Sequence, residues 1–169
     1  MSLQVRRATD DDARAIADVQ VETWRATYLD VMRADVLDAL DVEERERMWR
    51  RFAAADGFAV FVAEREERIV GFASVGACRD PPGTGELFAI YVAPHFQRTG
   101  AGLALMEAAV AWLAERWDEA VLWVATENPR ARRFYEQYGW IEDGERVDTS
   151  LIGAAVPETR YRLSGLTQR

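Results

Sequence analysis

The chain has 169 residues and a formal net charge of −8, with 21 lysine and arginine against 29 aspartate and glutamate side chains. This length predicts one domain over residues 1–169, and the excess of acid argues against nucleic acid or an anionic membrane surface as a partner. The hydrophobic fraction of 49% excludes a disordered chain, while a single cysteine and a single histidine exclude an internal disulfide and any metal site built from several such residues.

The N-terminal part predicts a strand and two helices. Residues 3–7 alternate apolar and polar side chains, which is the pattern of a short strand. Residues 9–12 resemble a capping box, with Asp12 in the place of the usual glutamate, and apolar side chains then recur at helical spacing as far as Trp24. A second helix is expected after Asp41, whose side chain is placed to cap it.

The middle of the chain predicts three strands and a buried helix. Residues 58–64 and 69–75 are rich in β-branched and aromatic side chains, and the polar stretch between them predicts a hairpin. Residues 86–92 are expected to form the next strand. Residues 101–117 carry apolar side chains at steps of three and four, with one charged side chain up to residue 114, so this helix should be buried on most sides.

The C-terminal part predicts a central strand, a helix and two weaker strands. Residues 120–125 are entirely apolar, and residues 129–138 begin with proline and are followed by glycine, the usual signals at the two ends of a helix. Residues 141–147 and 159–163 complete the expected elements. This order indicates a mixed α/β sheet with helices on its faces, in which the strands at 86–92 and 120–125 form a right-handed parallel crossover.

No targeting or membrane-spanning segment is expected. An acidic run at residues 10–12 stands where a signal peptide would need an apolar stretch. The longest apolar run, at residues 108–114, is too short to cross a bilayer. We therefore expect a cytoplasmic protein.

The most informative stretch is Gln97-Arg98-Thr99-Gly100-Ala101-Gly102-Leu103, between an expected strand and the buried helix. The first turn of a helix has unpaired N–H groups and a positive dipole end, and glycine lets a phosphate approach the backbone closely. A helix start that needs glycine only for packing is the alternative. The stretch is not a Walker loop, and Leu105 replaces the third glycine of a dinucleotide fingerprint.

Together with a second stretch, at residues 128–140, this motif resembles the GNAT superfamily of N-acetyltransferases. The family's pyrophosphate loop, Gln/Arg-x-x-Gly-x-Gly/Ala, is matched by residues 97–102. Its later signature is Asn-x-x-Ala-x-x-x-Tyr-x-x-x-Gly-Phe. This is matched in spacing by Asn128, Ala131, Tyr135 and Gly139, with Trp140 where phenylalanine is usual.

The resemblance implies the acyl-CoA N-acyltransferase fold, a central mixed β-sheet flanked by helices, and acetyl-CoA as co-substrate. Residues 90–92 would pair with the pantetheine arm through their backbone, residues 98–103 would hold the pyrophosphate, and Tyr135 would lie near the sulfur. The cofactor-binding residues expected on this basis are Ile90, Tyr91, Val92, Arg98, Thr99, Gly100, Ala101, Gly102, Leu103, Asn128 and Tyr135.

Acetyl transfer to an amine needs a base, a donor for the developing oxyanion and an acid. A lysine-like amine, with a pKa of about 10.4, is almost fully protonated at neutral pH, so a base assists its attack. Glu86 is the candidate, because some family members carry a catalytic glutamate at this position; a solvated glutamate is the alternative. The backbone N–H of Val92 is a plausible oxyanion donor, and Tyr135 can protonate the leaving thiolate.

The segment at the end of the first helix often forms a wall of the acceptor site in the family. Tyr28 and Glu86 are therefore the expected substrate-binding residues, while Trp24 is expected to pack in the core. His95 is expected to be a loop residue and Cys78 an inert thiol, so an acyl-cysteine intermediate is not expected.

The sequence therefore predicts an acetyl-CoA-dependent N-acetyltransferase that needs no metal and transfers the acetyl group directly within a ternary complex. The acceptor is either a small-molecule amine or a protein amine, at an N-terminus or a lysine. A non-catalytic acyl-CoA sensor is the alternative from another class. Homodimers are common in the family, and the sequence leaves the oligomeric state open.

Overall fold

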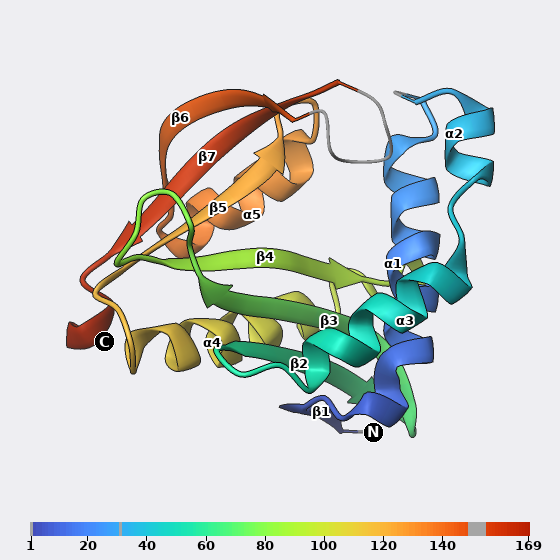
Figure 1. Cartoon of the computed structure of the whole chain (residues 1–169), viewed down its shortest axis with the longest axis horizontal. Coiled ribbons are helices and arrows are strands. Elements are labelled where there is room, and N and C mark those ends of the chain that lie inside the picture. Colours follow the sequence, from blue (N-terminus) through green and yellow to red (C-terminus); the bar gives the residue numbers. More distant parts are fainter. Residues whose placement is uncertain (1, 31, 149–154) are drawn as a thin grey trace.

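The computed structural model describes residues 2–30, 32–148 and 155–169. Seven strands among these residues form one sheet in the order β1-β2-β3-β4-β5-β7-β6 (Figure 1). The strands are β1 (Leu3–Arg7), β2 (Phe58–Arg65), β3 (Arg68–Ala77), β4 (Gly85–Val92), β5 (Glu119–Ala125), β6 (Ile141–Asp148) and β7 (Val156–Ser164). Neighbours are antiparallel except β4 and β5, which are parallel, so the sheet is mixed as the sequence predicts.

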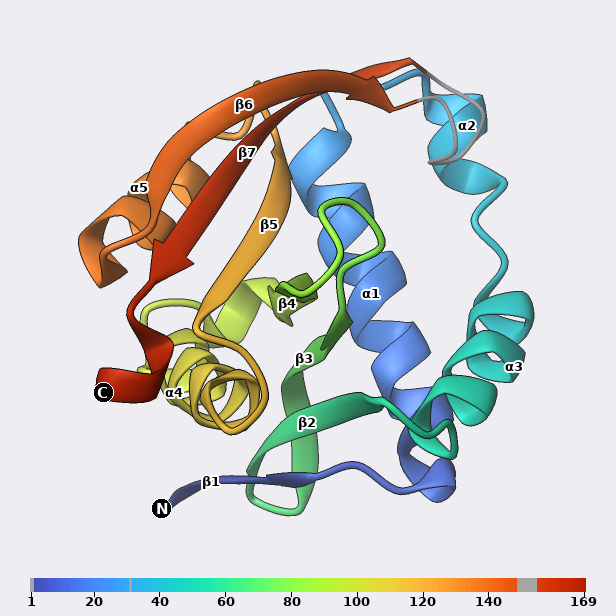
Figure 2. The same ribbon diagram turned by 60° about the vertical axis from the view of Figure 1, so that its left-hand side comes forward.

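Helices cover both faces of the sheet. On one face lie α1 (Ala13–Tyr28) and α3 (Val42–Ala53), with the short α2 (Ala34–Asp38) beyond the end of α1. On the other face lie α4 (Ala101–Ala114) and α5 (Pro129–Tyr138), as Figure 2 shows. Each side has its own apolar core. The side of α4 is centred on Leu105, Met106 and Leu113, and the side of α1 on Ile16 and Phe72, all of them fully buried.

The parallel pair β4–β5 is bonded only at its beginning. Gly85, Glu86 and Leu87 pair with residues 120–122, and past Leu87 the two strands have no register partners. At the same point β4 carries a bulge against β3, since Ser74 pairs with Ala89 and Val75 with Leu87. An extra residue bends a strand and increases its twist, which accompanies the divergence of β5 from β4 visible in Figure 1.

The predicted elements are present, and several details differ. The five-residue α2 was not predicted, because so short a segment carries no periodic pattern. The helix predicted to reach residue 117 ends at Ala114, and β7 begins at Val156, three residues before its predicted start. The β2–β3 turn consists of Glu66 and Glu67 alone, at φ +55° and +62°, which is the left-handed region that two-residue hairpins usually fill with asparagine and glycine.

Among the described residues, no helix has both the length and the apolar character that a membrane span requires.

The start of α1 is held by an acidic side chain. The Asp12 carboxylate accepts the backbone N–H of Thr9 at 2.8 Å, which confirms the predicted capping box. It also accepts both terminal nitrogens of Arg6, at 2.8 and 3.0 Å. The hydrogen bond from Arg6 lowers the pKa of Asp12, partly offset by burial. The carboxylate therefore joins β1 to α1.

We expect Asp12→Asn to lower the free energy of unfolding by about 0.5–1.5 kcal/mol at neutral pH, because it removes the charge that pairs with the half-exposed Arg6, while the amide oxygen can still accept the Thr9 N–H. Because the folded-state pKa is lowered, this contribution is present above the unfolded-state pKa and disappears as the pH falls through the folded-state value. Urea denaturation should show the two proteins converging at acid pH. Asp11→Asn, on the same turn but exposed, is the control and should be neutral; a difference that persists at acid pH contradicts the assignment.

Candidate active site

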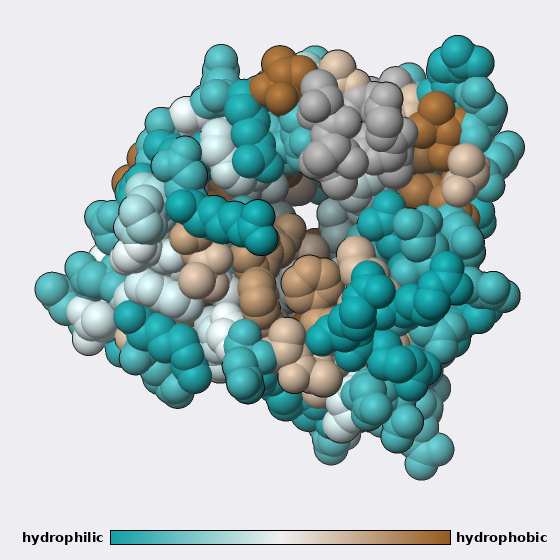
Figure 3. Space-filling model, viewed as in Figure 1, coloured by the Kyte–Doolittle hydropathy of each residue, from teal (hydrophilic) through white to brown (hydrophobic). Residues whose placement is uncertain are grey.

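A cleft of about 1350 Å³ opens where β4 and β5 part. One wall comes from α1, and the opposite wall from β5, α5 and the β6–β7 pair, with β4 between them and the start of α4 at one end. Figure 3 shows the hollow between the α1 side and the β6–β7 side, with apolar residues gathered beside it. All the site residues expected from the sequence line this cleft except Thr99 and Ala101.

The open edge of β4 presents backbone groups to the cleft. Ala93 donates its N–H to the Val70 carbonyl of β3 at 2.8 Å. Because successive amides of a strand point to opposite edges, the N–H groups of Ile90 and Val92 point away from β3, toward the space that β5 has left. The side chain of Gln97 lies on this edge, where its Nε2 donates to the Val92 carbonyl at 3.0 Å. An extended ligand can therefore pair with β4 as a partial strand.

The first turn of α4 has the form of an anion site. Arg98 has φ +65° and Gly100 has φ +91°, so the chain turns sharply before the helix begins at Ala101. Gly100 is the N-cap residue and offers no side chain, and the first helical hydrogen bond runs from the Ala104 N–H to the Gly100 carbonyl at 3.0 Å. The N–H groups of the preceding residues and the positive end of the helix dipole are left for a ligand.

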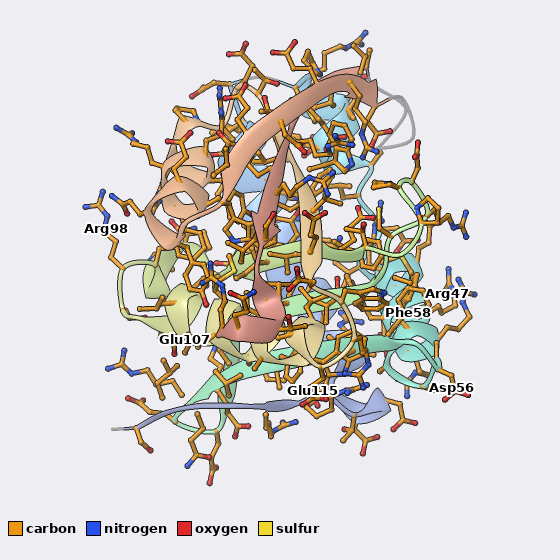
Figure 4. All side chains as sticks on the ribbon, turned by 90° about the vertical axis from the view of Figure 1, so that its left-hand side faces the viewer. Arg47, Asp56, Phe58, Arg98, Glu107 and Glu115 are labelled. Atoms are coloured by element: carbon orange, nitrogen blue, oxygen red, sulfur yellow. The ribbon has the colours of Figure 1, made fainter. Side chains whose placement is uncertain are left out.

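Two residues of this loop contribute only through their backbone. The hydroxyl of Thr99 is bonded to the Phe96 carbonyl at 2.5 Å, and the Ala101 side chain is fully buried. Neither side chain faces the cleft. The Arg98 side chain extends from the loop into solvent in Figure 4, where it is free to swing toward a bound anion.

The helix α5 carries Asn128 and Tyr135 into the cleft. Asn128 caps the helix, since its Oδ1 accepts the Ala131 N–H at 3.2 Å. Tyr135 is 8% exposed, and its hydroxyl has no hydrogen-bond partner among the described residues. Burial raises the pKa of Tyr135 far above its ordinary value, and the nearby hydroxyls of Tyr91 and Tyr28 add to the effect. This phenol stays protonated at any physiological pH.

Glu86 is the one acidic residue of β4, and it is the middle residue of the three that pair with β5. It is half-buried, on a central strand rather than an edge, and lines the cleft. Burial raises its pKa; the thiol of Cys78 and the charge of Arg146 lower it, and Glu158 raises it further. Cys78 itself is buried, and burial raises the pKa of its thiol to about 11.

The α1 wall is aromatic. Trp24 is 5% exposed and packs against Tyr28 and Tyr91, with ring centroids 5.3 and 6.5 Å apart. Burial raises the pKa of Tyr91 to about 12. Within the described part of the chain, the hydroxyl of the neighbouring Thr23 is buried without a hydrogen-bond partner; the indole Nε1 of Trp24 makes no hydrogen bond of good geometry, although it lies close enough to the Tyr91 hydroxyl to lower the pKa of that phenol. Trp24 thus packs, as predicted, and also borders the cleft beside Tyr28.

The β6–β7 side of the cleft carries residues that the sequence did not predict. Glu158 on β7, Arg146 and Asp148 on β6, and Trp123 on β5 all line it. Glu158 lay outside the predicted strand, and its burial depends on β7 pairing with both β5 and β6. No local pattern in the sequence marks it.

A model of the acetyltransferase (GNAT) family matches residues 16–140, nearly three quarters of the chain. The chain belongs to this family. The match confirms the predicted resemblance and the prediction that the protein is an acetyltransferase. An uncharacterised N-acetyltransferase of Bacillus subtilis, YuaI, is 36% identical over 138 residues, which cover 79% of this chain and 78% of that one.

Solved structures show the same fold. The PaiA N-acetyltransferase of Thermoplasma acidophilum, in complex with coenzyme A, superposes with a TM-score of 0.75 at 17% identity, over 94% of this chain and 98% of that one. YncA, a putative acetyltransferase of Salmonella typhimurium with its cofactor acetyl-CoA, gives 0.75 at 20% identity, over 97% and 94%. These likenesses confirm the predicted GNAT fold.

Gly102 offers a direct test of where coenzyme A binds. A Cβ at Gly102 meets only the Phe134 ring, at 3.6 Å, and Val92 at 3.8 Å, which are ordinary contacts, so the helix tolerates a side chain. We expect Gly102→Val to weaken coenzyme A binding about tenfold or more, equivalent to about 1.4 kcal/mol, because its methyl groups occupy the first turn where the pyrophosphate approaches. Calorimetry with coenzyme A measures this.

Glu107→Val is the matched control, since it places the same side chain on an exposed position of α4 outside the cleft. Gly100→Val is a poorer test, because φ +91° strains any side chain. Unchanged affinity in the folded Gly102→Val variant contradicts this placement.

Proposed function

We propose that this protein is an acetyl-CoA-dependent N-acetyltransferase that transfers the acetyl group directly to an amine bound in the same cleft. One observation carries the proposal: a single cleft joins the open edge of β4, the uncapped start of α4, the buried phenol of Tyr135 and the half-buried carboxyl of Glu86. The first two groups suit the binding of an acyl-CoA, and the last two can act as general acid and general base in amine acetylation.

The residues present fit coenzyme A. The pantetheine arm is an extended chain with two amides, which suits the N–H groups of Ile90 and Val92. The pyrophosphate suits the free N–H groups at Gly100–Leu103, where glycine leaves open space. Arg98 adds a cation that can reach the phosphate oxygens. Asn128 keeps its amide nitrogen for the arm, because only its oxygen is used to cap α5.

Acetyl-CoA supplies an acetyl group activated as a thioester. Glu86 takes the proton from the acceptor ammonium, directly or through one water, so that the neutral amine can attack. The Val92 N–H, already turned toward the cleft, donates to the carbonyl oxygen as negative charge develops on it. As the C–S bond breaks, Tyr135 gives its proton to the leaving thiolate, and the second proton of the attacking nitrogen restores the phenol. The raised pKa of Tyr135 keeps the phenol protonated before transfer and favours its reprotonation afterwards.

Direct transfer is favoured over an acyl-enzyme. The one cysteine, Cys78, does not line the cleft. With a thiol pKa of about 11, it is almost fully protonated at neutral pH, and the thiol is a poor nucleophile compared with the thiolate. Both substrates must therefore be bound together.

Glu86→Gln tests the base. We expect the variant to lose activity most strongly near neutral pH and to recover part of it at alkaline pH, where more acceptor amine is already neutral. The parent should also lose activity on the acid side at a higher pH than an ordinary carboxyl would impose, because burial raises the pKa of Glu86 and the base must be ionised. The measurement is the pH profile of kcat/KM for both proteins. Identical profiles would contradict the assignment of Glu86 as the general base.

Tyr135→Phe tests the acid. Since the hydroxyl makes no hydrogen bond within the described part of the chain, its removal should change the free energy of unfolding by less than about 1 kcal/mol. The chemical step should slow by about 10²–10⁴, while coenzyme A affinity stays the same. Single-turnover transfer and calorimetry on the same preparation separate the roles. Full-rate transfer makes Tyr135 a packing residue, and weak coenzyme A binding with intact chemistry makes it a binding residue.

A further inference from the structure

The charged side chains that line the cleft are sorted by sign. Among the described residues, the end at α4 and α5, where we place coenzyme A, carries Arg98, Arg130 and Arg133 with one carboxylate, that of Glu127. The end between α1 and β6–β7 carries three carboxylates and one guanidinium, those of Glu86, Asp148, Glu158 and Arg146. The acceptor end is therefore negative overall, and an unbalanced charge in a partly dry cleft favours a positive ligand.

Glu158 is the most buried of these carboxylates. Its side chain is 6% exposed, and its Oε1 accepts the Nε of Arg146 at 2.8 Å. Glu158, Tyr28 and Tyr91 line the same cleft, and the charge of Glu158 adds to the burial that raises the pKa of both tyrosines. The proposed chemistry gives Glu158 no task, and among the described residues the cost of burying its charge is offset only by the single hydrogen bond from Arg146.

Arg146 is not available for an anionic ligand. Besides its bond to Glu158, its Nη2 lies 3.8 Å from the Asp148 carboxylate, and its guanidinium stacks on the Trp123 ring at 4.0 Å. The guanidinium of Arg146 is therefore already held by the Glu158 and Asp148 carboxylates and by the Trp123 ring. An acceptor with a carboxylate of its own, such as a free amino acid, would meet carboxylates here and no unengaged cation.

The opposite wall has one polar group that can accept a hydrogen bond from a ligand. Thr23 and Trp24 line the cleft and are each 5% exposed, and the buried Thr23 hydroxyl has no partner among the described residues. The Trp24 indole N–H is a donor only and lies beside the Tyr91 hydroxyl, so it offers nothing to an ammonium group. A hydroxyl can accept a hydrogen bond from an ammonium group. The rings of Trp24, Tyr28 and Tyr91 beside it suit an alkyl chain and a cation.

We propose that the acceptor is an alkyl diamine or longer polyamine, with its reacting amine at Glu86 and its second ammonium at Glu158 against the α1 wall. This inference rests on the proposed function, because it names the substrate class of that reaction. Glu158 acts here as a specificity-determining residue and takes no part in proton transfer.

The experiment compares linear diamines with monoamines in which a methyl group replaces the second amino group, for example diaminopentane and hexylamine. We expect the parent protein to favour the diamine by about tenfold or more in kcat/KM, mostly through KM. Glu158→Gln should raise KM for the diamine by a similar factor and leave hexylamine nearly unchanged. Glu145→Gln is the matched control, because it removes a carboxylate from the same hairpin outside the cleft.

The outcomes separate the two proposals. Equal acetylation of diamine and monoamine by the parent overturns the diamine site and leaves N-acetyl transfer intact. A fall in kcat for both acceptors in Glu158→Gln overturns it as well, because Glu158 would then act in the chemical step. If coenzyme A binds and no amine is acetylated, the proposed function fails. Calorimetry of the diamine with the coenzyme A complex then still decides the site, since it requires binding that Glu158→Gln weakens.

A measurement on the parent protein alone guards against a variant that does not fold. Added salt screens charge pairs, so KM for the diamine should rise with ionic strength several times more steeply than KM for hexylamine. Parallel salt dependence of the two acceptors overturns the proposal.

Discussion

The parting of β4 from β5 after three paired residues is the constraint on which the site depends. A strand inside a sheet normally has both edges bonded, but the second half of β4 is bonded to β3 alone. Its other edge keeps donors that water or a ligand must satisfy. The bulge at Phe88 and the crossover helix α4 act at the same place, because the bulge bends β4 and the helix begins at the open end of the gap. The open backbone edge of β4 and the positive end of the α4 dipole therefore lie next to each other, so that one extended ligand can contact both.

The distribution of charge matters more to this site than its total. A chain of net charge −8 is a poor general binder of anions, and coenzyme A is a polyanion. The conflict disappears on the local scale, because the end of the cleft at α4 and α5 has an excess of arginine and the helix dipole adds to it. The other acidic side chains lie elsewhere, some at the acceptor end of the cleft and others on surfaces that face solvent.

The sequence predicts the parts of the fold that depend on local signals. The capping box at Thr9 and the proline and glycine that bound α5 are short-range features, and each predicted helix start holds. The cofactor side of the cleft is equally local, since one loop and one helix carry it. The acceptor side is not. Glu158 reaches the cleft only because β7 inserts between β5 and β6, which is a property of strand order that no window of residues contains. The bulge at Phe88 is likewise fixed by pairing with β3.

The places where this chain breaks the usual rules of burial help to locate function. Buried polar groups are normally satisfied, yet among the described residues the Thr23 hydroxyl and the Trp24 indole nitrogen are buried without a hydrogen-bond partner, and the hydroxyl of the 8%-exposed Tyr135 makes no hydrogen bond either. All three residues line one cleft. They come from two helices far apart in the sequence, so a shared local cause is excluded. Trp140 is the instructive contrast. Its indole nitrogen is also buried and unpartnered, but it does not line the cleft, and it stands where the family usually has phenylalanine. There the nitrogen is a by-product of a larger ring that fills the core. A single unsatisfied polar group therefore does not indicate a functional site. Several such groups that line one cleft, beside carboxylates with raised pKa values, do indicate a ligand site.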